Sequence, residues 1–208
     1  MVKRKIALFG GTFDPVHIGH TTVAAEAAEH IKAEKVFFVC AKRSPLKFLL
    51  PKASDEHRLK MLKLAIAGVE NFQTSNYELK KTGPGYTLET VRKFRADYGN
   101  DVSIHWLAGA DTVEELVRWY KINELIDNCT VSVMYRAGFK CPDFRQLTDI
   151  LGPGRVKKLQ QNVIKTSLIN ISSTQIRNRL AARQDASDML HPAVTEYIRK
   201  HNLYGAGC

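Results

Sequence analysis

The chain has 208 residues, a length that fits one α/β domain or one domain with a small appendage. At 44% apolar and 25% charged residues, its composition is that of an ordinary globular protein rather than a disordered or fibrous one. The sequence contains no apolar run of about 18 residues and its first residues lack a signal-peptide core, so we expect neither a membrane span nor secretion.

The net charge of +10 is concentrated in residues 136–183, where ten Lys or Arg stand against two Asp. A basic segment of this kind attracts polyanions, either nucleic acid or free nucleotides. A solvated face that only confers solubility would have the same composition.

The cysteines are Cys40, Cys129, Cys141 and Cys208. Because none has zinc-ligand spacing, we expect reduced thiols and a cytoplasmic protein.

Short apolar runs alternate with amphipathic runs along most of the chain. Strands are expected at 5–9, 36–40, 72–79, 102–107 and 130–135. Helices are expected at 19–32, at 56–67 behind Ser54 as N-cap, at 88–98, and from Asp111 onward. This alternation predicts a doubly wound, Rossmann-like α/β fold with a parallel sheet. Two helices, at 172–183 and 192–201, then predict a helical C-terminal appendage at about 172–208 on a single domain spanning 1–208.

The segment between the first strand and the first helix reads GGTFDPVHIGH, residues 10–20. In open α/β sheets, ligands bind beyond the carboxyl ends of the strands. The two glycines let the backbone approach a phosphate, and the helix start presents free N–H groups. His17 and His20 are three residues apart and can face the same side of that helix. The pattern predicts an anion site with two imidazoles; packed histidines, or a metal ion held with Asp14, are the alternatives.

This segment closely resembles the opening signature of the HxGH nucleotidyltransferases. Members of this superfamily join a nucleoside triphosphate to a phosphorylated acceptor and release pyrophosphate. The acceptor phosphate is already ionised near pH 7, so alignment and charge neutralisation suffice without a strong base. The resemblance implies that His17 and His20 are catalytic and that ATP also contacts Gly10, Gly11, Thr12 and Phe13.

Residues 171–177 read ISSTQIR and resemble the ISSTxIR motif of the same enzymes. The serines predict a helix N-cap, and an ordinary cap with a surface arginine is the alternative. The resemblance implies that Arg177 is a catalytic residue that reaches the leaving phosphates. It also implies an ATP site that includes Ile171, Ser172, Ser173, Thr174 and, from a G-x-D match, Gly109 and Asp111.

Two stretches, Gly85-Tyr86-Thr87 and Arg118-Trp119-Tyr120, resemble the SYT and WY stretches of bacterial-type nicotinate-nucleotide adenylyltransferases. The resemblance runs over nearly the whole chain. It implies that two aromatic rings pack on the pyridine ring, although the same rings could instead pack a helix end into the core. The mononucleotide site implied in this way comprises Thr87, Leu88, Trp119, Tyr120 and Arg136.

Other stretches match this family without an implied role, and one departs from it. Residues 58–62 match a family helix, and residues 202–204 match the usual GLY ending with Asn in place of Gly. The loop at 40–47 keeps only Pro45 and Lys47 of the family's PNxxPPHK pattern. Lys47 is therefore the catalytic phosphate ligand expected from this loop, and Lys42 and Arg43 are candidates to supply replacement charge.

The resemblance predicts an enzyme of NAD biosynthesis that transfers AMP from ATP to nicotinate mononucleotide, giving deamido-NAD and pyrophosphate. A Mg²⁺ ion bound mainly through the ATP phosphates is expected. Nicotinamide mononucleotide or another phosphorylated acceptor is the first alternative. A non-catalytic nucleotide- or nucleic-acid-binding protein is the second. ATP and the pyridine mononucleotide are the expected partners, without nucleic acid or membrane, and a homo-oligomer is possible.

Overall fold

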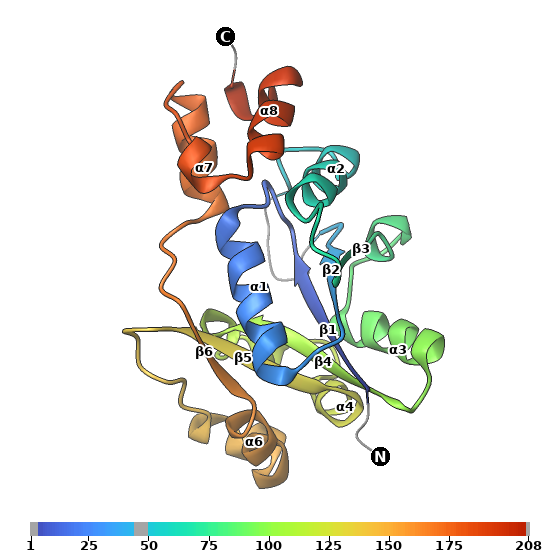
Figure 1. Cartoon of the computed structure of the whole chain (residues 1–208). Coiled ribbons are helices and arrows are strands. Elements are labelled where there is room, and N and C mark those ends of the chain that lie inside the picture. Colours follow the sequence, from blue (N-terminus) through green and yellow to red (C-terminus); the bar gives the residue numbers. More distant parts are fainter. Residues whose placement is uncertain (1–3, 44–49, 207–208) are drawn as a thin grey trace.

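The computed structural model describes residues 4–43 and 50–206. Within them, six parallel strands form one sheet in the order β3-β2-β1-β4-β5-β6, with helices on both faces (Figure 1). This arrangement confirms the predicted Rossmann-like α/β fold. The strands are β1 (Arg4–Gly11), β2 (Lys35–Cys40), β3 (Phe72–Ser75), β4 (Val102–Gly109), β5 (Thr130–Arg136) and β6 (Val163–Thr166). The helices are α1 (Ile18–Ile31), α2 (Asp55–Ala65), α3 (Thr87–Tyr98), α4 (Ile122–Asn128), α5 (Thr148–Leu151), α6 (Pro153–Gln160), α7 (Ser173–Ala181) and α8 (Pro192–Lys200).

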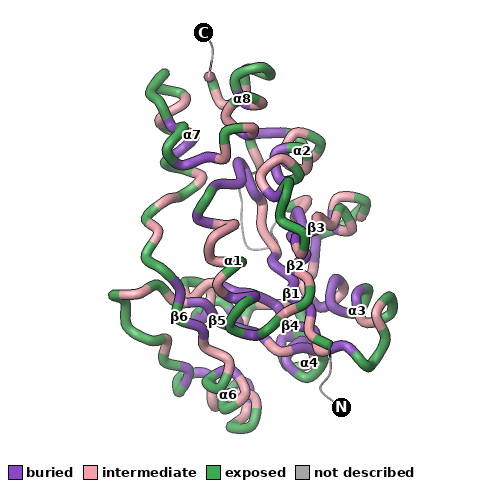
Figure 2. The backbone as a smooth tube through the Cα atoms, viewed as in Figure 1, coloured by how far each residue is buried: buried purple, intermediate pink, exposed green. Residues whose placement is uncertain are grey.

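Each face of the sheet has its own apolar core, because parallel strands are buried on both sides. On one face, Phe9 and Phe38 belong to a core that includes residues of α1, α2, α7 and α8. On the other face, Leu8 and Trp106 belong to a core with α3, α4 and α6. Figure 2 shows the result, with buried segments along the strands and exposed ones on the outer turns of the helices. The central strand β1 therefore contributes alternate side chains to both cores.

The strand order reverses between β1 and β4. In sheets of this kind, helices leave the two neighbouring strands toward opposite faces and open a crevice at the carboxyl ends, where ligands bind. Gly10 lies at this point, and a Cβ atom built on it would lie 2.5 Å from the ring of Trp106 on β4. The first glycine of the opening segment is thus needed for the packing of the two central strands.

Two expected elements are wrong in their extent. The strand expected at 72–79 ends at Ser75, whose hydroxyl accepts the N–H of Tyr77 (3.3 Å) and turns the chain into a 3₁₀ turn at Glu78–Lys80. No α-helix starts at Asp111. The Thr112 hydroxyl instead donates to the carbonyl of Gly109 (2.7 Å), and two 3₁₀ turns, at Ala110–Thr112 and Leu116–Arg118, precede α4.

Three elements between β5 and α7 were not expected from the sequence. They are α5, α6 and β6, and none is longer than eight residues. Such short elements do not fill the window of about 11–18 residues over which helical periodicity is recognised, so periodicity does not distinguish them from loop. Their effect is to extend the parallel sheet by β6, which pairs with β5 from Arg136↔Thr166 back to Val133↔Val163.

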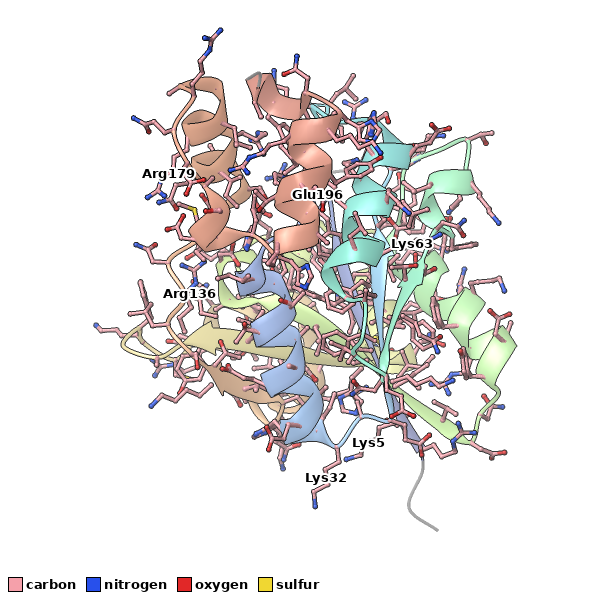
Figure 3. All side chains as sticks on the ribbon, turned by 45° about the horizontal axis from the view of Figure 1, so that its top comes forward. Lys5, Lys32, Lys63, Arg136, Arg179 and Glu196 are labelled. Atoms are coloured by element: carbon pink, nitrogen blue, oxygen red, sulfur yellow. The ribbon has the colours of Figure 1, made fainter. Side chains whose placement is uncertain are left out.

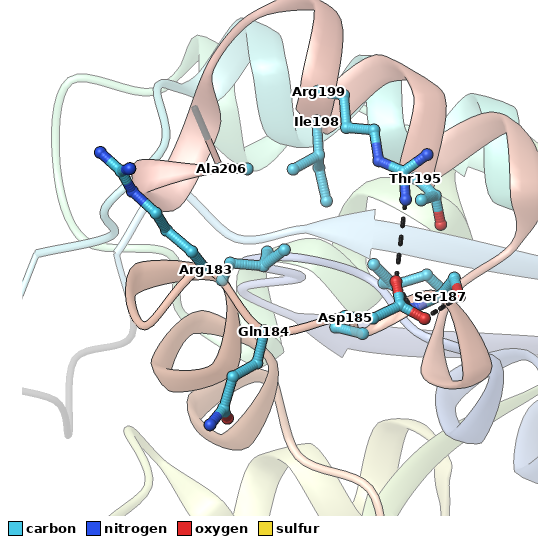
Figure 4. A pocket seen from close by; sticks show the side chains of 11 residues that line it. Arg183, Gln184, Asp185, Ser187, Thr195, Ile198, Arg199 and Ala206 are labelled. Carbon is cyan, nitrogen blue, oxygen red and sulfur yellow. Dashed lines mark hydrogen bonds and ion pairs between the residues drawn. The ribbon is translucent and has the colours of Figure 1, made fainter. Parts of the chain in front are cut away.

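The C-terminal helices α7 and α8 lie above the start of α1, and α8 packs on α2 (Figure 1). A 3₁₀ turn at Leu203–Gly205 contacts both α7 and α8. Between these helices is a cavity of about 220 Å³, whose rim carries the Asp185–Arg199 ion pair (3.7 Å; Figure 4). None of its lining residues belongs to the predicted site. None of the described helices is long and apolar enough to cross a membrane.

Candidate active site

His17 and His20 lie together at the start of α1, just beyond the carboxyl end of β1. His17 is the N-cap residue of the helix, and its backbone N–H donates to Nδ1 of His20 (3.3 Å). The ring centroids of the two imidazoles are 3.7 Å apart. The structure therefore brings the predicted pair to one place, beside the free N–H groups and the positive dipole end of a helix.

The environment of His17 makes it a neutral donor. Burial, together with the positive charge of Arg136, lowers the pKa of His17 to about 4. Arg136, labelled in Figure 3, is the exposed last residue of β5. At pH 7 the His17 ring is neutral and keeps one N–H group, which can donate to a phosphate oxygen.

Phe13 fixes the loop that carries the two histidines. Its ring is 2% exposed and meets the ring of His20 edge-on, with centroids 5.2 Å apart. A Cβ atom on Gly11 would lie 2.8 Å from the Phe13 ring. The second glycine of the opening segment is therefore required by the packing of Phe13, in addition to the phosphate approach predicted for it.

A fully buried arginine on α2 joins the segments that follow β1 and β2. Nη1 of Arg58 donates to the carbonyls of Thr12 (2.6 Å) and Ala41 (2.7 Å), and Nη2 donates to Asp55 (2.6 Å). These bonds satisfy carbonyl groups that lie beyond the strand ends and have no ladder partner there. Arg58 thereby sets the spacing between the opening loop and the loop after β2.

The carboxylate of Asp14 is also held on several sides. It is 5% exposed and accepts the N–H groups of Lys52 (2.7 Å) and Ala53 (3.1 Å) and the hydroxyl of Tyr204 (2.7 Å). Among residues 4–43 and 50–206, no three His, Cys, Asp or Glu side chains form a group that could hold a metal ion. Asp14 is thus used in holding the loop, which disfavours a metal site shared with the histidine pair.

The ISST segment starts α7 against the opening loop. The Ser172 hydroxyl accepts the N–H of Gln175 (3.1 Å), which confirms the predicted N-cap. The Ser173 hydroxyl donates to the carbonyl of Pro15 (2.9 Å), so α7 is tied directly to the segment before His17. Ile171, just before the helix, packs against the core on the α1 face of the sheet.

Arg177 reaches the same loop from the next turn of α7. Its Nη1 donates to the carbonyl of Asp14 (2.7 Å) and its Nη2 to the hydroxyl of Thr174 (3.1 Å). The guanidinium is therefore next to the opening segment and is bonded to protein groups there. A guanidinium has five N–H donors, so these two bonds leave donors for a phosphate.

The residues predicted to hold the pyridine ring lie around the start of α3 and the turn before α4. Tyr120 is 42% exposed and stacks on Tyr86, with centroids 4.4 Å apart and planes at 25°. Trp119 instead packs against the core on the α3 face. Thr87 and Leu88 form the first turn of α3, where backbone N–H groups have no partner within the helix. This turn could bind a carboxylate through the backbone.

The other predicted residues lie at the ends of β4 and β2. Gly109 ends β4, and a Cβ atom on it would collide with the carboxylate of Asp111, an exposed residue in the turn that follows. Lys47 lies outside the described residues. Lys42 donates from Nζ to the carbonyl of Lys81 (2.7 Å), so it connects two loops, whereas Arg43 is exposed. The ends of three neighbouring strands, β1, β4 and β5, thus carry part of the predicted site, and the starts of α3 and α7 carry much of the rest.

The contacts of Asp14, Arg58 and Tyr204 were not predicted from the sequence. The bond from Arg58 to Thr12 spans 46 residues, and the bond from Tyr204 to Asp14 spans 190. All three residues lie in stretches that match the family, which is the one signal that could have marked them. Local spacing cannot reveal contacts over such separations.

Comparison with known proteins agrees with this geometry. The family model described as cytidylyltransferase-like matches residues 8–179. A "probable nicotinate-nucleotide adenylyltransferase" of Dehalococcoides mccartyi is 35% identical over 206 residues, covering 98% of each chain. A protein of the same name from Listeria monocytogenes is 35% identical, covering 98% of this chain and 99% of its own. This chain belongs to the nicotinate-nucleotide adenylyltransferase family. As a member of this family, it is an enzyme of the nucleotidyltransferase type.

Solved structures of nicotinate-nucleotide adenylyltransferases share the fold. Two structures of the Plasmodium falciparum nicotinic acid mononucleotide adenylyltransferase, one complexed with APC and one with NaAD, give TM-scores of 0.71 and 0.73. Each covers 98% of both chains, at 19% sequence identity. At this identity the likeness shows the fold, which is retained over nearly the full length, including the C-terminal helices.

Proposed function

We propose that this chain transfers AMP from ATP to nicotinate mononucleotide, giving deamido-NAD and pyrophosphate in NAD biosynthesis. Membership of the family over nearly the whole chain supports the reaction and the acceptor. The observation in the structure that carries the proposal is the imidazole pair of His17 and His20 at the start of α1, beside the reversal of strand order. Fixed donors at a helix start are suited to charge that develops on a phosphate.

In the proposed reaction, an oxygen of the acceptor phosphate attacks the α-phosphorus of ATP. The bond from that phosphorus to the oxygen bridging to the β-phosphorus breaks, and pyrophosphate leaves. The acceptor oxygen is already deprotonated, since the second pKa of a phosphate monoester is about 6. His17 and His20 donate to the oxygens of the α-phosphate, while Arg177 and Lys47 neutralise the leaving group.

The two substrates are assigned to neighbouring positions at the carboxyl ends of the strands. ATP lies along residues 10–13, Gly109, Asp111 and residues 171–174, with its phosphates toward the histidine pair. The mononucleotide lies toward Thr87, Leu88, Trp119, Tyr120 and Arg136. Mg²⁺ accompanies the triphosphate, bound mainly through phosphate oxygens and water. A single domain over 1–208, a cytoplasmic location and a homo-oligomer stay predictions.

The decisive experiment is a pyrophosphate-release assay with MgATP and a panel of phosphorylated acceptors. We expect the highest kcat/KM with nicotinate mononucleotide. A higher kcat/KM with nicotinamide mononucleotide would support the same transfer reaction but identify nicotinamide mononucleotide as the preferred acceptor. Release of no pyrophosphate with any acceptor, together with nucleic-acid binding that weakens steeply with salt, would favour a non-catalytic role.

The role of His20 is tested by His20→Ala. We expect kcat to fall on the order of a hundredfold, in the range seen on loss of one donor to a developing oxyanion. His30→Ala is the matched control, because His30 is an exposed residue in the last turn of the same helix and should leave kcat unchanged. Near-normal turnover of a folded His20→Ala variant would remove His20 from the mechanism.

A further inference from the structure

The last turn of the chain reaches back to the opening loop. The 3₁₀ turn at Leu203–Gly205 packs against α7 and α8, and from it the hydroxyl of Tyr204 donates to Oδ1 of Asp14 (2.7 Å). Asp14 precedes His17 by three residues. Tyr204 belongs to the family-matching stretch 202–204, to which the sequence assigned no role.

The bond from Tyr204 completes the surroundings of a buried carboxylate. Asp14 is 5% exposed, and a buried charge is tolerated only when its oxygens are hydrogen-bonded. Oδ2 accepts the N–H of Lys52 at 2.7 Å, whereas Oδ1 accepts the N–H of Ala53 at 3.1 Å and the phenol at 2.7 Å. The hydroxyl of Tyr204 is therefore the closer of the two donors to Oδ1.

The conformation of Tyr204 shows that this contact is held by its surroundings. Its backbone has φ 59° and ψ 21°, in the left-handed region that bulky side chains rarely adopt. Such a conformation persists only where packing and hydrogen bonds maintain it. Burial, and then the charge of Asp14, raise the pKa of the Tyr204 phenol, so it stays a neutral donor throughout the working pH range.

The same short loop receives two further bonds from the C-terminal part of the chain. The Ser173 hydroxyl donates to the carbonyl of Pro15, and Arg177 donates to the carbonyl of Asp14. Those two bonds hold the backbone, and Tyr204 holds the side chain. The residues directly before His17 are thus tied to α7 and to the last turn, rather than only to the sheet.

We propose that Tyr204 is a positioning residue of the transfer reaction, which holds the Asp14 side chain and thereby the loop that presents His17 and His20. The inference rests on the function proposed above. Because small displacements of groups that act in the transition state lower turnover strongly, loss of one hydroxyl in the last turn should be felt at the histidine pair. Tyr204 does not need to touch either substrate.

The test is Tyr204→Phe, which removes one oxygen atom and keeps the ring. We expect kcat to fall about tenfold, with the KM values for ATP and the acceptor within about twofold of those of the unmodified chain. The matched control is Tyr197→Phe on α8, because the Tyr197 hydroxyl also connects the C-terminal part of the chain to an earlier element, through Nδ1 of His57 on α2 (2.9 Å). Tyr197→Phe should leave kcat unchanged. Equal losses in the two variants, or no loss in Tyr204→Phe, would overturn the proposal.

A double substitution shows whether Tyr204 acts through Asp14. If it does, adding Tyr204→Phe to Asp14→Asn should lower kcat no further than Asp14→Asn alone, because residues that act through one contact are not additive. If the reductions in kcat of the two single variants instead multiply in the double variant, Tyr204 acts separately from Asp14 and the inference is rejected.

A measurement that does not depend on catalytic activity distinguishes failure of this inference from failure of the proposed function. In ¹⁵N–¹H spectra of the imidazole nitrogens, Tyr204→Phe should shift the resonances of His17 and His20, whereas Tyr197→Phe should shift those of His57. If the unmodified chain releases no pyrophosphate with any acceptor, the proposed function fails while these shifts can still be observed. Unchanged His17 and His20 resonances in Tyr204→Phe would refute the positioning role.

Discussion

His17 and His105 are both buried imidazoles close to β1: His17 follows the carboxyl end of the strand, and His105 lies on the neighbouring strand β4. His105 is 6% exposed, and its Nδ1 lies 3.0 Å from the hydroxyl of Ser132. Burial, followed by the positive charges of Lys5 and Lys158, lowers the pKa of His105 to about 4, the same value as for His17. Both rings are thus kept neutral by the fold, and the folded chain resists protonating them.

These two pKa values make stability depend on pH in a defined window. Between pH 6.5, the ordinary histidine value, and about 4, the unfolded chain binds more protons than the folded one, so stability falls as pH falls through this window. Each histidine contributes a loss on the order of 3 kcal/mol at most. Urea unfolding at several pH values measures the effect. His105→Gln should flatten the dependence, and a free energy of unfolding that is constant over the window would contradict the prediction.

The buried side chain of Arg58 is expected to make a large contribution to the free energy of unfolding. We expect Arg58→Met to lower the free energy of unfolding by about 3 kcal/mol or more, because the Thr12 and Ala41 carbonyls lose a charged donor and Asp55 loses its partner. Arg92→Met is the control: Arg92 pairs with Glu124 on the surface and should cost no more than about 1 kcal/mol. Equal losses on urea unfolding would show that the burial of Arg58 is not what matters.

At the scale of elements, the predicted site residues lie around three strand ends and three helix starts. β1, β4 and β5 end at neighbouring positions in the sheet, and α1, α3 and α7 begin near them. The start of α7 is bonded to the loop that leads into α1. Since free N–H groups cluster at helix starts, this arrangement concentrates donors for anions at one edge of the sheet.

The contact between β1 and β4 is tested by Gly10→Ala. The added methyl group would meet the Trp106 ring, which is 5% exposed and enclosed by the core, so we expect a loss of about 1–3 kcal/mol. In Gly83→Ala, the methyl group has no heavy atom within 4 Å, and stability should stay the same or rise slightly. Thermal unfolding of the two variants makes the comparison. Equal stability would mean that β1 and β4 can move apart at no cost.

At the scale of the whole molecule, the net charge of +10 favours encounter with anionic substrates. We expect the KM for ATP to rise several-fold between about 50 and 500 mM salt, with a smaller change in kcat, because screening acts on long-range attraction more than on buried contacts. Steady-state kinetics across this range measures both constants. A KM that does not depend on salt would assign the basic residues to solubility alone.

Much of this protein could be predicted because the necessary information is local. Apolar runs of five or six residues between helical repeats indicate a parallel sheet, and residues 10–20 and 171–177 are the two segments in which the sequence predicts phosphate ligands. The helix caps at Ser54 and Ser172 follow the preference of serine for that position. The turns after Gly109 were missed because the Thr112 hydroxyl bonds to the Gly109 carbonyl in place of a continuing helix. The strand β6 was missed because four residues are too few to show a strand pattern.

The sequence by itself determined the fold class, the family and the imidazole pair, because periodicity and short motifs depend only on residues that are close together along the chain. Only the tertiary structure decided what holds the pair in place. Asp14 has its carboxylate bonded by Tyr204 from the end of the chain, and Thr12 has its carbonyl bonded by Arg58 from α2. Such contacts form only after the sheet has brought the segments together, so they depend on the packing of the whole chain rather than on any one stretch of it.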